Sequence, residues 1–104
     1  MSTRTVDITT TGRRSGAPRT IETWVHERDG RDYLSGRPGP RGWYANLRAD
    51  PRLTVDGRPA TARLITEPDE RADVLGWLAV DHAGADRLQA WLDGSPLAEI
   101  EYDD

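Results

Sequence analysis

Apolar and β-branched residues alternate with polar ones in six short segments, a pattern typical of strands with one buried face. These segments are Thr5–Thr10, Thr20–Arg28, Asp32–Ser35, Leu53–Val55, Ala60–Thr66 and Leu97–Tyr102. Asp29-Gly30 and Asp56-Gly57 each separate two of them, and Asp-Gly is a strong signal for a tight hairpin. Six short strands with two such turns favour a small barrel over an open α/β sheet.

Three other segments have the pattern of helices. Trp43–Ala49 predicts a short helix that stops before Pro51. An acidic stretch from Thr66 to Glu70 has the features of a capped helix start. The apolar face that follows consists of Val74, Leu75, Leu78, Ala79 and His82, and after a break at Gly84 a shorter one consists of Leu88, Trp91 and Leu92. We therefore expect one α+β, mainly β domain over residues 1–104, with a short helix after the third strand and two acidic helices near the C-terminus.

The composition excludes several classes of site. The chain has no cysteine, which removes disulfides, thiolate nucleophiles and thiolate metal ligands. Its two histidines, His26 and His82, make a metal site built by the protein unexpected. No apolar run approaches about 18 residues and no leader precedes the first strand, so we expect a cytoplasmic protein without an integral membrane segment.

Charge is distributed unevenly along the chain, whose net charge is −4. All 14 basic residues are arginine; residues 1–63 carry 12 of them against 7 acidic residues, whereas residues 64–104 carry 2 against 11. Nonspecific nucleic-acid binding needs a broadly basic surface, which this chain lacks. Genomic base composition would explain the exclusive use of arginine but not the asymmetry. A local site for a phosphate or carboxylate fits the asymmetry, because guanidinium binds such groups in bidentate fashion.

Two segments in the arginine-rich half carry candidate chemistry. The turn Gly12-Arg13-Arg14-Ser15-Gly16 offers guanidiniums, a hydroxyl and flexible amides, which together form an anion-binding concavity, although an ordinary solvated hairpin loop has the same composition. Ser35-Gly36-Arg37 opens a loop rich in Gly and Pro that ends at an aromatic pair beginning with Trp43. Trp43 is also spaced to contact Leu47 in the core.

The two segments together resemble one known family. Thr9–Arg19 (TTTGRRSGAPR), then Trp24, Asp29-Gly30 and Ser35, and finally Trp43–Pro51 (WYANLRADP) follow in the order and spacing of the deazaflavin-dependent nitroreductase and quinone reductase family. The resemblance spans roughly Ile8–Val55, about half of the chain. It implies a split β-barrel that holds coenzyme F420 and transfers hydride from the reduced deazaflavin to a small organic acceptor: a quinone, an enone or a nitro compound.

The resemblance also implies roles for individual residues. Arg13, Arg14, Ser15 and Gly16, followed by Pro18, would hold the phosphate and anionic tail, and Arg37 stands where the family has a basic residue that also meets the tail. Ser35 and Gly36 would run beside the deazaflavin ring, with Trp43 packing near it. Trp24 falls where the family has an aromatic residue facing the substrate side. A cofactor that ends in phosphate and glutamates needs clustered arginine, and a tricyclic ring needs an aromatic wall.

The sequence departs from the family in one stretch that bears on the substrate. Some members carry tyrosines in the helical segment that covers the substrate, whereas Asp81–Trp91 has none. Two alternatives therefore stay open: a split barrel that uses FMN or haem, and a non-catalytic or cofactor-independent protein that binds a small ligand in the same groove. The expected partners are a small-molecule substrate and at most a second copy, since the chain is either a monomer or a homodimer.

The one catalytic group for which the sequence offers a candidate is a proton donor to the acceptor. His82 is the candidate, because histidine titrates near neutrality. The alternative role for His82 is an interaction with the helix dipole at the C-terminal end of its helix. His26, which alternates with Val25 beside the acidic Glu27, is expected at the surface.

Overall fold

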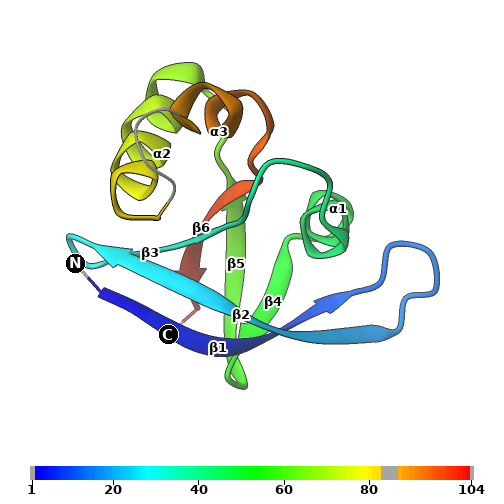
Figure 1. Cartoon of the computed structure of the whole chain (residues 1–104). Helices are drawn as coiled ribbons and strands as arrows, with labels where there is room; N and C mark the ends of the chain where they lie inside the picture. The colour runs from blue at the N-terminus through cyan, green and yellow to red at the C-terminus, as the bar shows by residue number, and fades with distance from the viewer. Residues whose placement is uncertain (1, 83–86, 104) are drawn as a thin grey trace.

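Six antiparallel strands close into a barrel in the order β1-β2-β3-β6-β5-β4 (Figure 1). The computed structural model describes residues 2–82 and 87–103, of which residues 2 and 80–82 are described by backbone only. The strands are β1 (Ser2–Thr11), β2 (Pro18–Arg28), β3 (Arg31–Ser35), β4 (Arg52–Val55), β5 (Arg58–Leu64) and β6 (Leu97–Tyr102). The helices in these ranges are α1 (Gly42–Ala49), α2 (Pro68–His82) and α3 (Leu88–Gly94). The predicted class and element order are confirmed, while the predicted helix break at Gly84 lies outside the described residues.

Both predicted Asp-Gly turns are present. Asp29 and Gly30 have φ of 54° and 78°, and Asp56 and Gly57 have φ of 50° and 81°. Two successive residues with positive φ define the type I′ turn, whose twist matches that of the strands it joins. The registers follow, since Arg28 pairs with Arg31, and Val55 with Arg58.

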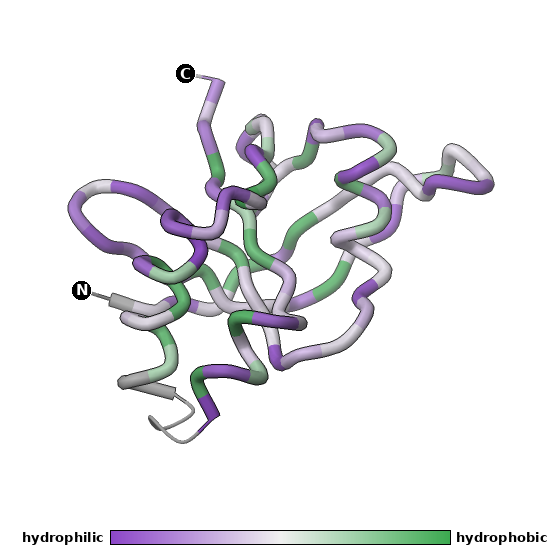
Figure 2. The backbone as a smooth tube through the Cα atoms, turned by 90° about the horizontal axis from the view of Figure 1, so that it is seen from above, coloured by the Kyte–Doolittle hydropathy of each residue, from purple (hydrophilic) through white to green (hydrophobic). Residues whose placement is uncertain are grey.

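Two apolar clusters fill the molecule. The barrel interior holds Ile8, Val25 and Leu34, which are fully buried, because alternate residues of a strand face the same side. A second cluster lies between the barrel and α2, where Leu75 and Leu78 pack with residues of β3 and β6. Figure 2 shows the apolar stretches inside the fold and hydrophilic stretches in the turns that project from it.

The start of α2 is capped within the predicted acidic segment. The carboxylate of Glu67 caps the helix: its oxygens accept the backbone N–H groups of Asp69 at 3.1 Å and Glu70 at 2.8 Å. The sequence pattern named the right segment because Ser, Thr and acidic side chains all satisfy free N–H groups at a helix start.

The β1–β2 hairpin is longer than the barrel that it helps to close. β1 pairs with β2 from Ser2↔Glu27 to Thr11↔Pro18, but it pairs with β4 only over Ile8–Thr10. The far end of the hairpin therefore projects beyond the barrel, on the side where α1 lies (Figure 1). This projection sets the arginine-rich turn apart from the packed core.

Candidate functional site

Two pockets follow one another along β2. The first, here called the hairpin pocket, has a volume of about 360 Å³ and lies between the β1–β2 turn and the start of α1. Its lining comprises Thr10, Gly12, Arg13, Arg14, Ser15, Arg19, Ile21, Gly42, Trp43 and Asn46. The second, here called the helix-capped pocket, has a volume of about 570 Å³. Its lining comprises Glu22, Thr23, Trp24, His26, Ser35, Gly36, Arg37, Leu78 and Trp91.

The turn beside the hairpin pocket is held in one shape by its own backbone. Gly12 donates its N–H to the carbonyl of Ala17 and accepts the N–H of Gly16, both at 2.8 Å. The hydroxyl oxygen of Ser15 accepts the N–H of Ala17 at 3.1 Å. A Cβ at position 12 would lie 3.0 Å from the Ala17 oxygen, so this closed turn needs glycine there.

Asn46 fastens this turn to α1. Its side chain is buried, with 6% of the residue exposed, and its Oδ1 accepts the backbone N–H of Arg13 at 3.1 Å and an Nη of the same residue at 3.3 Å. Its Nδ2 donates to Oγ1 of Thr10 at 3.1 Å. A buried amide with all these bonds fixes the two walls of the pocket relative to each other.

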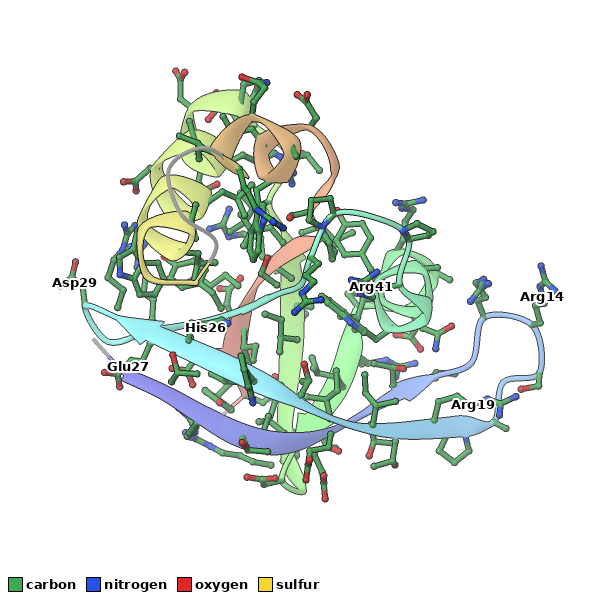
Figure 3. All side chains as sticks on the ribbon, viewed as in Figure 1. Arg14, Arg19, His26, Glu27, Asp29 and Arg41 are labelled. Carbon is green, nitrogen blue, oxygen red and sulfur yellow. The ribbon has the colours of Figure 1, made fainter. Side chains whose placement is uncertain are left out.

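Unpaired arginines surround both pockets. The side chains of Arg14, Arg19 and Arg37 are exposed and make no hydrogen bond or ion pair within residues 2–82 and 87–103. Among the described residues, the guanidinium of Arg13 bonds to the amide oxygen of Asn46. Figure 3 shows Arg14 and Arg19 projecting from the far end of the hairpin. Four positive charges that have no carboxylate partner in the described part of the chain therefore surround the two pockets, which favours an anionic ligand.

The helix-capped pocket combines apolar walls with a fixed loop. Trp24 leaves 55% of its surface exposed, and Leu78 of α2 and the half-buried Trp91 of α3 close the pocket from above. The hydroxyl of Ser35 is turned inward, where it donates to the carbonyl of Pro96 at 2.7 Å. The pocket can receive a flat, mainly apolar group, which Ser35 would meet through its backbone rather than its hydroxyl.

Comparison with known families assigns the chain. The sequence model of the F420H2-dependent quinone reductase family matches residues 3–97. The chain belongs to this family. It is therefore an oxidoreductase of the F420-dependent class, and the recognised resemblance is confirmed. A search of the curated proteins found no match.

Solved structures share the fold at low sequence identity. A reductase dependent on F420-H2, FDR-A, is 23% identical with a TM-score of 0.67, covering 93% of each chain. A protein described as a domain-swapped dimer is 24% identical with a TM-score of 0.69, covering 93% of this chain and 79% of that one. A putative pyridoxamine 5'-phosphate oxidase from Listeria innocua is 10% identical with a TM-score of 0.72, covering 96% of this chain and 84% of the other. These likenesses confirm the split-barrel fold; whether this chain is a monomer or a homodimer stays a prediction.

The residues present fit the cofactor of this family. F420 joins a flat deazaflavin ring to an anionic tail, and the two pockets offer aromatic side chains and guanidiniums that have no carboxylate partner among the described residues. Within the described ranges no helix is long and apolar enough to cross a membrane.

The predicted site residues fall into two groups. Arg13, Arg14, Ser15 and Trp43 line the hairpin pocket, and Trp24, Ser35, Gly36 and Arg37 line the helix-capped pocket. Gly16, with a φ of 72°, shapes the turn, and Pro18 begins β2, but neither lines the hairpin pocket or the helix-capped pocket. The core role expected for Trp43 is confirmed, since it is 8% exposed and belongs to the barrel core together with Leu47, while its place beside the deazaflavin ring stays a prediction.

The expectation for His26 was wrong. It is 6% exposed, lines the helix-capped pocket and has its Nδ1 3.1 Å from Oγ1 of Thr3. Figure 3 shows it on β2 facing the helical layer, and Leu78 of that layer lines the same pocket. Alternation along a strand cannot reveal a helix that covers the polar face, and this is why sequence reasoning placed His26 at the surface.

Other pocket residues were not foreseen. Asn46 lies inside the recognised WYANLRADP segment, so the motif pointed to it although no role could be assigned from the sequence. Arg19 and Trp91 line the pockets too, but no feature of the sequence distinguishes them. His82, the predicted proton donor, ends α2, and its side chain lies outside the described residues.

Proposed function

We propose that this enzyme transfers hydride from reduced F420 to a quinone, with the cofactor tail in the hairpin pocket and the ring in the helix-capped pocket. The observation that carries the proposal is that arginines without a carboxylate partner among the described residues surround the hairpin pocket, and that the next pocket along β2 has two tryptophans in its walls. The family supports the quinone as acceptor, since its description names quinone reductase.

The hairpin turn would hold the tail. Arg13 and Arg14 present guanidiniums, and Ser15 and Gly16 complete the turn that carries them. Arg37 would reach the same anionic chain from the loop after β3, and Pro18 would fix the entry into β2. Because Asn46 holds the turn before any ligand arrives, less conformational entropy is lost on binding.

The helix-capped pocket would orient the ring against the acceptor. Trp24 and Trp91 supply aromatic faces, while the backbone of Ser35 and Gly36 runs along the edge of the pocket. Trp43 would support the ring from the side of the hairpin pocket. When bound, reduced F420 supplies the hydride, and the protein contributes position and exclusion of water.

A hydroquinone product also needs a proton in addition to the hydride. We retain His82 as the proposed donor from the sequence and add His26, which lines the pocket together with Glu22. Replacing each histidine by glutamine and recording the pH profile of turnover separates the two. The true donor is the one whose variant loses the limb near neutral pH, and an unchanged profile in both variants would eliminate both.

The experiment for the proposed function is an anaerobic assay with purified protein, F420H2 and a soluble quinone. We expect protein-dependent formation of oxidised F420 and one hydroquinone per F420H2. A nitro compound and an enone as acceptors test the other substrate classes, and protein supplied with reduced FMN or with haem tests the alternative cofactors. Turnover with reduced FMN but not with F420H2 would overturn the proposal, and binding of F420 without any turnover would favour a non-catalytic protein.

A further inference from the structure

A third pocket lies outside the two that follow β2. It has a volume of about 530 Å³, within the range of small-molecule sites, and shares no lining residue with the other two. Its walls come from the loop Gly39–Arg41, from the face of α1 that bears Tyr44 and Arg48, and from the connection between α3 and β6. We call it the rear pocket.

Three arginines line the rear pocket, and none of them is paired with a carboxylate within the described ranges. Arg41 donates to the carbonyls of Pro40 and Arg37, each at 3.0 Å. Arg71 donates only to backbone carbonyls, among them that of Ser95 at 2.8 Å. These bonds orient the guanidiniums without neutralising them.

The remaining charges leave the rear pocket positive. Arg48 lies over the ring of Tyr44, with its guanidinium carbon 5.2 Å from the ring centroid. Asp93 is the one acidic residue in the lining, and it accepts a hydrogen bond from Gln89 at 2.9 Å. Three arginines against one aspartate give a net charge of +2, which matches a dianion rather than a singly charged carboxylate.

A buried hydroxyl in the same wall lacks a partner. Ser95 is 3% exposed, and its Oγ makes no hydrogen bond with any residue that the structure describes. That oxygen has less than 1 Å² of accessible surface, so it lies inside the wall and not in the pocket. Thr66 adds a hydroxyl to the lining.

We propose that the rear pocket binds the phosphate group of a small phosphorylated metabolite. The three guanidiniums would bind its oxygens. The volume exceeds the need of a bare phosphate and leaves room for the organic part of the ligand. This site is independent of the F420 assignment, because none of its residues lines the pockets along β2.

The test uses the ¹⁵N-labelled full chain without F420, titrated with inorganic phosphate while chloride keeps the ionic strength constant. We expect saturable shifts in the backbone amides of Gly39, Gly94 and Ser95 that acetate does not reproduce. Shifts confined to the hairpin amides of Gly12–Gly16, or shifts at the rear pocket that never saturate, would overturn the proposal.

Variants connect those shifts to the named side chains. Arg48→Gln should weaken phosphate binding at the rear pocket about tenfold or more, because one charge-assisted hydrogen bond is lost. Arg41→Gln should weaken it to a similar extent, since the guanidinium of Arg41 bonds to backbone carbonyls and not to a carboxylate among the described residues. Arg52→Gln is the matched control, because Arg52 is exposed and pairs with Asp50 outside the pocket. Unchanged binding in both Arg48→Gln and Arg41→Gln would reject the site.

Discussion

Two regions of this enzyme use the same side chain in opposite ways. Around the two pockets, the pocket arginines Arg13, Arg14, Arg19 and Arg37 have no carboxylate partner among the described residues. Elsewhere on the barrel, the wall arginines Arg4 of β1 and Arg63 of β5 are bound to acidic side chains. The difference distinguishes arginines that are available to bind a ligand from arginines whose ion pairs stabilise the fold.

The wall arginines form compact networks. Arg63 donates to Glu70 of α2 and to Glu99 of β6, each at 2.6 Å, so it ties the helix to the barrel. The hydrogen bond from Arg63 lowers the pKa of Glu70. Arg4 and Tyr102 both donate to Asp32, at 2.9 and 2.7 Å, and burial raises the pKa of Tyr102 above its ordinary value.

The pocket arginines show the reverse balance. Unsatisfied charge at a solvated surface contributes little to folding, but it gains several interactions when a polyanion binds. Replacing a pocket arginine should therefore change binding and not stability, and replacing a wall arginine should do the opposite. Three arginine variants test this contrast and one tryptophan variant tests the pocket beside the arginines, from the largest expected effect to the smallest.

The double variant Arg14→Gln/Arg37→Gln should have the largest effect. Each lost charge-assisted bond costs about 1.5–3 kcal/mol, so F420 affinity should fall about a hundredfold or more. The midpoint of thermal unfolding should stay unchanged, because neither side chain bonds to the described protein. Fluorescence titration and calorimetry on the same sample measure both, and unchanged affinity would refute the tail assignment.

Trp24→Ala should lower kcat/KM for the acceptor about three- to tenfold. An aromatic contact is worth about 0.5–1.5 kcal/mol, and Trp24 leaves 55% of its surface exposed for such a contact. Trp24→Phe, which keeps an aromatic face, should restore most of the rate. Equal rates in wild type and the alanine variant would remove Trp24 from the pocket's function.

Arg63→Gln should reduce the free energy of unfolding by about 1 kcal/mol at neutral pH and leave F420 affinity unchanged. We discount the ion pairs for solvent screening, because the Arg63 side chain is 42% exposed. Glu101→Gln, which removes a charge from an exposed position on the same strand as Glu99, is the matched control.

The same variant predicts a dependence on pH. The pKa of Glu70 in the folded protein is lowered from about 4.5, so its ion pair stabilises above that pH and is lost as the pH falls through the folded pKa. The stability difference between wild type and Arg63→Gln should therefore shrink between about pH 6 and about pH 3. A constant difference in chemical denaturation would contradict the ion-pair explanation.

The smallest effect is expected at a pair on the protein surface. Arg52 is 81% exposed and binds Asp50 two residues away, at 3.0 Å, which lowers the pKa of Asp50. Arg52→Gln should change neither stability nor F420 affinity measurably, because exposed local pairs gain little over their hydration. A clear loss in either measurement would show that the exposure of an arginine does not by itself predict how much its ion pair contributes.

Local patterns were enough to predict the elements of the fold. The Asp29-Gly30 and Asp56-Gly57 turns and the alternation in β2 depend on short-range geometry, and the structure confirms them. The arginine-rich turn was recognised for the same reason, because its residues are adjacent in the chain.

The features that local sequence patterns did not predict depend on tertiary packing. His26 became buried because the polar face of β2 is covered there, and Asn46 gained its role through contacts with residues more than 30 positions away. The rear pocket joins a loop before α1 to the end of α3, and no local pattern predicts that meeting. The pairing of individual arginines likewise depends on which acids the barrel brings across from other strands.

The most direct test of the pocket arginines is a titration of the purified protein with F420, followed by tryptophan emission at low and at high salt. We predict quenching at about micromolar or lower cofactor concentration, weakened by salt because exposed charges are screened. The double variant Arg14→Gln/Arg37→Gln should show weaker binding and a smaller dependence on salt. Folded protein without any quenching, or quenching that salt and the double variant leave unchanged, would contradict the account.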